Sequence, residues 1–179
     1  MKIVPADENG LELAAGVLLG GGVAVVPTDT VYGLAAHPAF PDAVRRLYSI
    51  KDRAAAKPIA LLASDTGAAA GFVGAAAAAV GGAHWPGALT VVANGEGVRV
   101  PAHAWLQRLI ARCGGALRVT SANVSGGGDA TDAEAAFRQV GLSADLTVDG
   151  GVSPGGEASS VWKVDAAGIE VLREGPVKL

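Results

Sequence analysis

The spacing of apolar residues near the start of the chain predicts a helix followed directly by a strand. Asp7 can cap the helix, and the glycines at 20–22 can end it, because glycine readily adopts the left-handed conformation found at helix ends. The apolar positions of this helix recur at intervals of three and four residues, at Leu11, Ala14, Ala15, Leu18 and Leu19. The apolar run VAVV at 23–26 then predicts a buried strand.

The rest of the chain continues this alternation and indicates an α/β domain. Further helices are expected at 42–50, 65–80, 102–113 and 131–140. Further strands are expected at 58–63, 88–93, 97–101, 116–120, 146–150, 159–165 and 169–173. The strands 88–93 and 97–101 are separated by a short turn and predict a hairpin, so the sheet should be mixed.

Composition narrows the class of protein. A length of 179 residues predicts a single domain, 1–179, and the 50% hydrophobic content is enough for a substantial core. The net charge of −3 argues against a protein that binds nucleic acid over its whole surface, although a local basic patch remains open. The single cysteine, Cys113, fits a reducing compartment. With neither a signal peptide nor an apolar run of about 20 residues, the expected location is cytoplasmic, with no membrane partner.

Several familiar catalytic motifs are absent, or lack the neighbouring residues and elements that they require. No Walker A or G-x-G-x-x-G sequence follows a strand. Residues 151–155, GVSPG, match the G-x-S-x-G elbow, but Pro154 has no N–H to serve as the oxyanion donor, which favours a glycine-rich loop. The histidines His37, His84 and His103 lack metal-ligand spacing, so no metal site is predicted.

Small polar side chains stand at the ends of three of the predicted strands. The strand 23–26 opens onto PTDTVYGL, the strand 116–120 onto TSANVSGG, and Ser159 and Ser160 mark a third strand end. Each segment alone is an ordinary turn composition. Their repetition at strand ends favours a ligand crevice.

A basic cluster, Lys51, Arg53 and Lys57, lies just beyond the helix at 42–50. Cations at a helix C-terminus are favoured by the helix dipole, so a solvated helix end explains the cluster without any ligand. The alternative is a clamp for a polyphosphate, with lysine as a point charge and arginine as a fork.

Eight short segments in one order give the chain a resemblance to a known family. They are PTDTVYGL (27–34), KDRAAAKP (51–58), WPGALTVV (85–92), VRVPAH (98–103), TSANVSG (120–126), DGG (149–151), SSV (159–161) and LREGP (172–176). With these segments the chain resembles the YrdC family of threonylcarbamoyl-AMP synthases over nearly its whole length, in the short, single-domain form.

The resemblance implies a fold and a reaction. The expected fold is a three-layer arrangement with a mixed, twisted sheet flanked by helices and an open, positively lined concave face. The expected activity is that of a nucleotidyltransferase: L-threonine and bicarbonate form a carbamate that attacks the α-phosphate of ATP, giving threonylcarbamoyl-AMP and pyrophosphate. Mg²⁺ is expected with the nucleotide. The product would pass to an enzyme complex that modifies tRNA, and a weak direct contact with tRNA remains open.

The resemblance also implies roles for individual residues. Catalysis is assigned to Lys51 and Arg53. The ATP contacts are assigned to Lys51, Arg53, Lys57, Asn123, Thr131 and Arg173. The threonine contacts are assigned to Thr30, Tyr32, Arg99, Ser121 and Ser159. Lys51 and Arg53 are expected to be exposed, so that alanine at either position should reduce turnover severely without loss of the fold.

Three positions depart from the family pattern without removing a charge that the chemistry requires, and two other functions also stay open. Ala54 stands where many members have proline, Leu62 where some have a histidine that contacts threonine, and Ser159–Ser160 where a Ser-Thr pair is common. A relative that makes a carbamoyl adenylate from carbamoyl phosphate is one alternative, although such domains usually belong to much longer chains. The other is a non-catalytic module that binds tRNA or double-stranded RNA.

Overall fold

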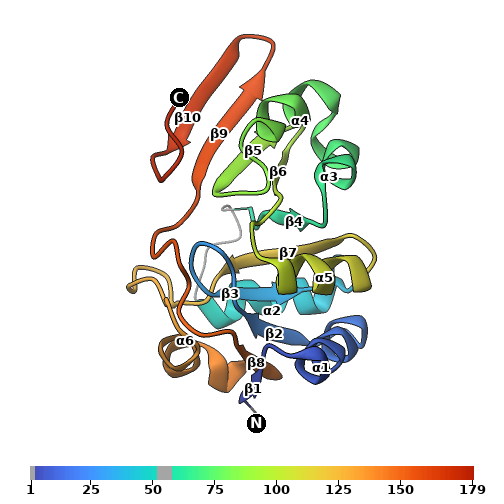
Figure 1. Cartoon of the computed structure of the whole chain (residues 1–179), viewed down its shortest axis with the longest axis vertical. Helices are drawn as coiled ribbons and strands as arrows, with labels where there is room; N and C mark the ends of the chain where they lie inside the picture. Colours follow the sequence, from blue (N-terminus) through green and yellow to red (C-terminus); the bar gives the residue numbers. More distant parts are fainter. Residues whose placement is uncertain (1–2, 52–57) are drawn as a thin grey trace.

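The computed structural model describes residues 3–51 and 58–179, and within them the strands form one mixed sheet (Figure 1). The strands lie in the order β1-β8-β2-β3-β7-β4-β6-β5-β9-β10. Their bounds are β1 Ile3–Pro5, β2 Val23–Val26, β3 Gly33–Ala36, β4 Leu61–Ala63, β5 Leu89–Ala93, β6 Glu96–Arg99, β7 Ala116–Ser121, β8 Leu146–Asp149, β9 Ser160–Asp165 and β10 Gly168–Arg173. The pairs β1–β8, β2–β8, β4–β6 and β5–β9 are parallel and the other five pairs are antiparallel. The expected mixed α/β fold is therefore confirmed.

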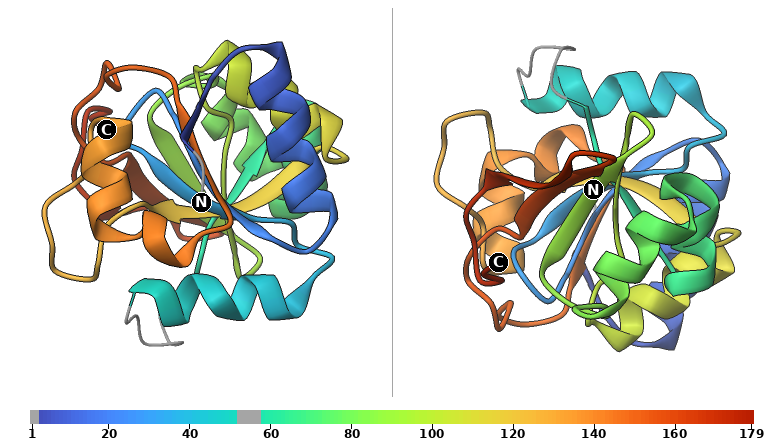
Figure 2. Two further views of the ribbon diagram at one scale, coloured as in Figure 1. Left: turned by 90° about the horizontal axis from the view of Figure 1, so that it is seen from below. Right: turned by 90° about the horizontal axis from the view of Figure 1, so that it is seen from above.

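Helices cover the sheet and enclose three apolar clusters. The helices are α1 Glu8–Leu19, α2 Pro41–Lys51, α3 Thr66–Val73, α4 Ala75–Gly82, α5 Ala104–Arg112 and α6 Ala133–Gln139, with a 3₁₀ turn at Gly141–Ser143. Helices α1 and α5 share one cluster, α2 and α6 a second, and α3 and α4 a third. Figure 2 shows α1 and α2 on opposite sides of the strands. Within the described ranges, none of the helices has the length and apolar character needed to cross a membrane.

The continuous apolar run of β2 follows from its burial on both faces. Ala24 and Val26 pack into the cluster with α1 and α5, whereas Val23 and Val25 pack into the cluster with α2 and α6. Because successive strand residues point to opposite faces, a strand between two helical layers needs no polar positions.

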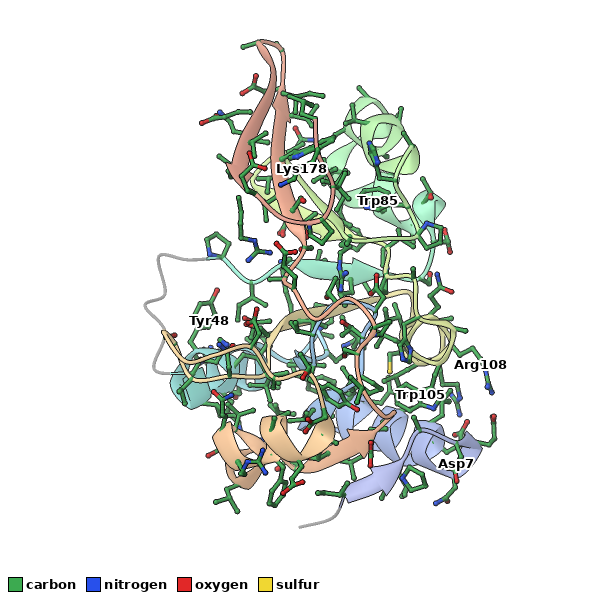
Figure 3. The ribbon with its side chains drawn as sticks, turned by 60° about the vertical axis from the view of Figure 1, so that its left-hand side comes forward. Asp7, Tyr48, Trp85, Trp105, Arg108 and Lys178 are labelled. Atoms are coloured by element: carbon green, nitrogen blue, oxygen red, sulfur yellow. The ribbon has the colours of Figure 1, made fainter. Side chains whose placement is uncertain are left out.

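The first helix begins at the cap that the sequence predicted, and residues of α5 hold the same end. The Asp7 carboxylate accepts a hydrogen bond from the Gly10 N–H at 2.8 Å and caps α1. The indole N–H of Trp105 on α5 donates to the Asp7 carbonyl at 3.0 Å, and Arg108 forms an ion pair with Glu8 (Figure 3). These contacts tie α5 to the start of α1.

The predicted single helix at 65–80 is wrong, because the structure divides it into α3 and α4. Gly74 lies between them with φ = 85°, a left-handed conformation that ends α3 and that an alanine would not readily adopt. Alanine propensity alone could not locate this break. The short strands β1 and β3 were also not predicted, and β4 begins at Leu61, three residues later than expected.

Candidate active site

A cavity of about 670 Å³ is lined by the loop that follows β2 and by residues of β4, β5, β6, β7, β9 and β10. Its apolar wall includes Ile59, Leu62, Val92, Val119, Val161 and Leu172. Six of the residues expected to bind substrates line it: Thr30, Tyr32, Arg99, Ser121, Ser159 and Arg173. These six come from segments far apart in the sequence, so the fold assembles them in one place.

The loop that leaves β2 is held in shape by Thr28. The Thr28 hydroxyl donates to the Val31 carbonyl at 2.8 Å and accepts from the Thr30 N–H at 3.0 Å. Its oxygen is also 3.0 Å from the Thr30 hydroxyl oxygen, and both threonines are buried. This local network fixes the Thr30 hydroxyl at the cavity wall, which explains why hydroxyl residues follow a buried strand.

Arg99 at the end of β6 brings a buried positive charge to the cavity. Its Nη1 atom lies 3.2 Å from Oδ1 of Asp29, and the two side chains are only 5% and 9% exposed. Neither of these atoms makes a well-aligned hydrogen bond within the described residues. Burial lowers the pKa of Arg99; the Asp29 carboxylate opposes this effect, and the nearby Arg173 adds to it. Together, Arg99, Arg173 and Asp29 leave net positive charge, which suits an anionic ligand.

Ser159 is held by residues on both sides of the cavity. Its hydroxyl oxygen is 2.9 Å from that of Thr90 on β5. Arg173 on β10 donates to the Ser159 carbonyl at 2.8 Å and to its hydroxyl at 3.1 Å. The C-terminal hairpin β9–β10 therefore places Arg173 so that it fixes Ser159 at the cavity wall.

Tyr32 lines the cavity and also holds the loop that follows β8. The Tyr32 hydroxyl donates to the Gly151 carbonyl at 2.7 Å and accepts from the Gly150 N–H at 3.0 Å. Its side chain is fully buried, and that burial raises the pKa of the phenol. The hydroxyl thus anchors the loop that follows β8.

The expectation that Lys51 is exposed is wrong, because its side chain is only 2% exposed. Lys51, Asn123 and Thr131 are not among the residues that line the cavity. The Asn123 amide is engaged at both ends, accepting from the Lys51 ammonium and donating to the Gly127 carbonyl. The Thr131 carbonyl accepts from the Ser153 N–H at 2.7 Å. Arg53 and Lys57 lie outside the described residues.

Three contributors to the site were not assigned a role from the sequence: Thr28, Asp29 and Thr90. Thr28 and Asp29 stood in the polar segment after the strand 23–26, which marked the position but not the partners. Thr90 is a polar residue inside an apolar strand, and its burial beside Ser159 accounts for its presence. A buried hydroxyl of this kind requires a hydrogen-bond partner, which could have drawn attention to it.

The histidines and the cysteine do not form a metal site within the described part of the chain. Among residues 3–51 and 58–179, no group of three or more His, Cys, Asp or Glu side chains could hold an ion. Burial raises the pKa of the Cys113 thiol to about 11, so this buried thiol is a poor nucleophile at neutral pH.

We expect the stability of the fold to fall with pH below about 6.5, through His103. Its Nδ1 atom accepts from the Leu106 N–H at 3.2 Å and caps α5, which requires an unprotonated Nδ1. Burial lowers the pKa of His103, an effect that Asp29 opposes, so the unfolded chain takes up the proton at a higher pH than the folded chain. The contribution is therefore complete above pH 6.5 and is lost as the pH falls toward the folded pKa.

Urea unfolding at several pH values tests this expectation. His103→Asn keeps a side chain that caps helices but does not titrate, so the difference between wild type and variant isolates the histidine. The wild type should lose about 1 kcal/mol more than the variant on acidification, the value of a typical cap. Parallel pH profiles for the two proteins would contradict the assignment.

Comparison with known proteins supports the family resemblance seen in the sequence. A family model described as Sua5/YciO/YrdC, telomere recombination, matches residues 16–175. A putative threonylcarbamoyl-AMP synthase from Mycobacterium leprae is 33% identical over 96% of this chain and 85% of its own. The threonylcarbamoyl-AMP synthase of Idiomarina loihiensis is 31% identical over 86% of this chain and 91% of its own.

A solved structure extends the agreement to the whole fold. The crystal structure of P. abyssi Sua5 complexed with L-threonine matches with a TM-score of 0.91 and 26% identity. The match covers 98% of this chain and 58% of the P. abyssi protein. The resemblance seen in the sequence motifs is therefore confirmed, and the chain belongs to the Sua5/YciO/YrdC family.

Proposed function

We propose that this chain is a threonylcarbamoyl-AMP synthase, an enzyme that converts L-threonine, bicarbonate and ATP into L-threonylcarbamoyladenylate and pyrophosphate. The observation that carries the proposal is the convergence of six expected substrate residues on one cavity. Family membership and the named relatives support the same activity.

The cavity offers groups suited to an amino acid. The carboxylate of threonine and the carbamate formed from it are negatively charged, and the Arg99 guanidinium is a buried cation at the cavity wall. The hydroxyls of Thr30, Ser121 and Ser159 can each donate to or accept from the amino-acid groups. Asp29 holds Arg99 in place from the side, so the guanidinium is oriented before the substrate arrives.

The nucleotide is proposed to enter from the side of the basic cluster. Pro58, which directly follows the segment with Arg53 and Lys57, lines the cavity, as does Arg173. When the carbamate oxygen attacks the α-phosphorus, the bond to pyrophosphate breaks and charge develops on the phosphate oxygens. Positioned cations stabilise that charge, which is the task proposed for Arg53, Lys57 and Arg173.

Mg²⁺ would be held mainly by the nucleotide. The polar side chains that line the cavity are hydroxyls and arginines, whereas Mg²⁺ prefers carboxylate, phosphate and water oxygens. Asp29 already faces Arg99. The residues present therefore fit an ion that is coordinated by the phosphates and by water, where it would neutralise their charge.

The product is a mixed anhydride of a carbamic acid and a phosphate, which water can destroy. We propose that an enzyme complex which transfers the threonylcarbamoyl group to tRNA consumes it, in the cytoplasm. A direct contact between this chain and tRNA would use Arg53 and Lys57 of the basic cluster, since Lys51 is buried.

Pyrophosphate release from ATP and Mg²⁺ tests the proposed activity. Release that requires both L-threonine and bicarbonate is the expected result. Release with carbamoyl phosphate alone would instead assign the chain to the carbamoyl-adenylate branch. If the folded protein releases no pyrophosphate in any mixture, an RNA titration at several salt concentrations becomes decisive, because binding through phosphates weakens steeply with salt.

A further inference from the structure

The ammonium group of Lys51, at the last position of α2, is buried among oxygens of the turn that follows β7. Its Nζ lies 2.5 Å from the Ser121 carbonyl oxygen and 2.5 Å from that of Asn123. It lies 2.9 Å from Oδ1 of Asn123 and 3.3 Å from the Ser121 hydroxyl. An ammonium group has three N–H donors, and these oxygens provide enough acceptors for all three.

The main chain of Lys51 holds the same turn. Its carbonyl accepts from the Ser125 N–H at 2.9 Å, and Asn123 extends the network by donating to the Gly127 carbonyl at 2.7 Å. Lys51 therefore binds the turn from both its side chain and its backbone. A buried charge persists only where such bonds replace its water.

This turn determines where Ser121 lies in the cavity. Ser121 pairs with Gly33 in the β3–β7 register, and the Ala122 N–H donates to the Tyr32 carbonyl at 2.7 Å. Ser121 lines the cavity, whereas Lys51 does not. The ammonium group of Lys51 therefore contacts Ser121, and Ser121 in turn lines the cavity.

We propose that Lys51 is a positioning residue that acts through the Ser121–Asn123 turn and does not contact the phosphates of ATP. Only the kinetic consequence of this proposal rests on the proposed function. The hydrogen bonds of the Lys51 ammonium group fix the Ser121 hydroxyl against the amino-acid end of the cavity.

The first test requires no activity. Lys51→Met removes the ammonium but keeps most of the stem, so hydrogen–deuterium exchange of the amides at 122–127 should become at least about tenfold faster, as expected when buried hydrogen bonds are lost. Exchange in β2 should stay unchanged. Lys163→Met, which removes an exposed lysine charge on β9, is the matched control and should leave the turn unchanged. Unchanged exchange at 122–127 in Lys51→Met would overturn the proposal whether or not the chain is a synthase.

Pyrophosphate-release kinetics provide the second test. Lys51→Met should raise the KM for threonine about tenfold and change the KM for ATP less than the KM for threonine. Lys51→Gln is neutral but retains N–H donors, so it should recover part of the loss; it also serves if the methionine variant does not fold. A larger effect on the KM for ATP than on the KM for threonine would show that the charge acts on phosphate. A glutamine variant as impaired as the methionine variant would show that hydrogen bonding to the turn is not what matters. Either result would overturn the proposal. If the wild type releases no pyrophosphate, the proposed function fails, and the exchange experiment alone decides the role of Lys51.

Discussion

Replacing Arg99 by methionine is expected to lower the free energy of unfolding by about 3–5 kcal/mol, the usual result of removing one partner of a buried ion pair. The Asp29 side chain is only 9% exposed and its Oδ1 faces Arg99 at 3.2 Å. Without the guanidinium, the Asp29 carboxylate would lose its partner in a site with little water. Most of the expected loss is therefore the cost of the unpaired Asp29 rather than the attraction itself.

The double variant Asp29→Asn, Arg99→Met separates these two contributions. Because it removes both charges, it should be more stable than Arg99→Met alone. Arg112→Met is the matched control: Arg112 is 54% exposed and pairs with Glu12 at 3.3 Å, so its loss should cost less than about 1 kcal/mol. Urea unfolding of the four proteins measures each value. A double variant less stable than Arg99→Met would contradict the role given to the buried carboxylate.

The same ion pair marks the limit of what the sequence could predict. The motifs identified Arg99 as a ligand for an amino-acid carboxylate, and the structure places it in the cavity. The partner Asp29 could not be identified, because the strand order β2-β3-β7-β4-β6 that brings the two residues together depends on tertiary contacts. Local patterns report which residues are buried and which lie at strand ends. They do not report which strand end meets which.

Lys51 illustrates the same limit, because its helix was predicted from the sequence but its burial was not. A cation at the end of an amphipathic helix is normally exposed, and the helix itself was predicted well, since α2 spans Pro41–Lys51. Its burial depends on the turn at Ser121–Asn123, which belongs to a distant strand. The break at Gly74 was missed for a different reason: a helical glycine and a glycine with positive φ look the same in the sequence.

Replacing Gly155 by alanine is expected to reduce kcat/KM for threonine about a hundredfold, the effect of displacing a substrate-positioning group by about 1 Å. Gly155 belongs to the GVSPG loop, which the sequence identified only as glycine-rich. Its N–H donates to the Asp29 carbonyl at 3.0 Å, so the loop lies directly on the segment with Thr28 and Thr30. A Cβ atom at Gly155 would lie 2.6 Å from that carbonyl oxygen and 3.0 Å from the Thr30 Cα.

Both of these neighbours are backbone atoms, so no side-chain rotation can relieve the clash. Either the GVSPG loop lifts and loses its bond to Asp29, or the Thr28–Thr30 segment moves and takes the Thr30 hydroxyl with it. Gly155 itself is exposed, so we expect the free energy of unfolding to fall by no more than about 1–2 kcal/mol, within the common range for single substitutions.

Gly128→Ala is the matched control, because Gly128 is also an exposed loop glycine and an added Cβ would meet no atom within 4 Å. Its kcat/KM should stay within about twofold of wild type, as expected of surface substitutions that disturb no specific contact. Pyrophosphate release at varied threonine and saturating ATP measures the effect, and urea unfolding confirms that both variants are folded. If Gly155→Ala retains the wild-type kcat/KM, then the position of Thr30 does not depend on the GVSPG loop, and the threonine site must be held from the β3 side alone.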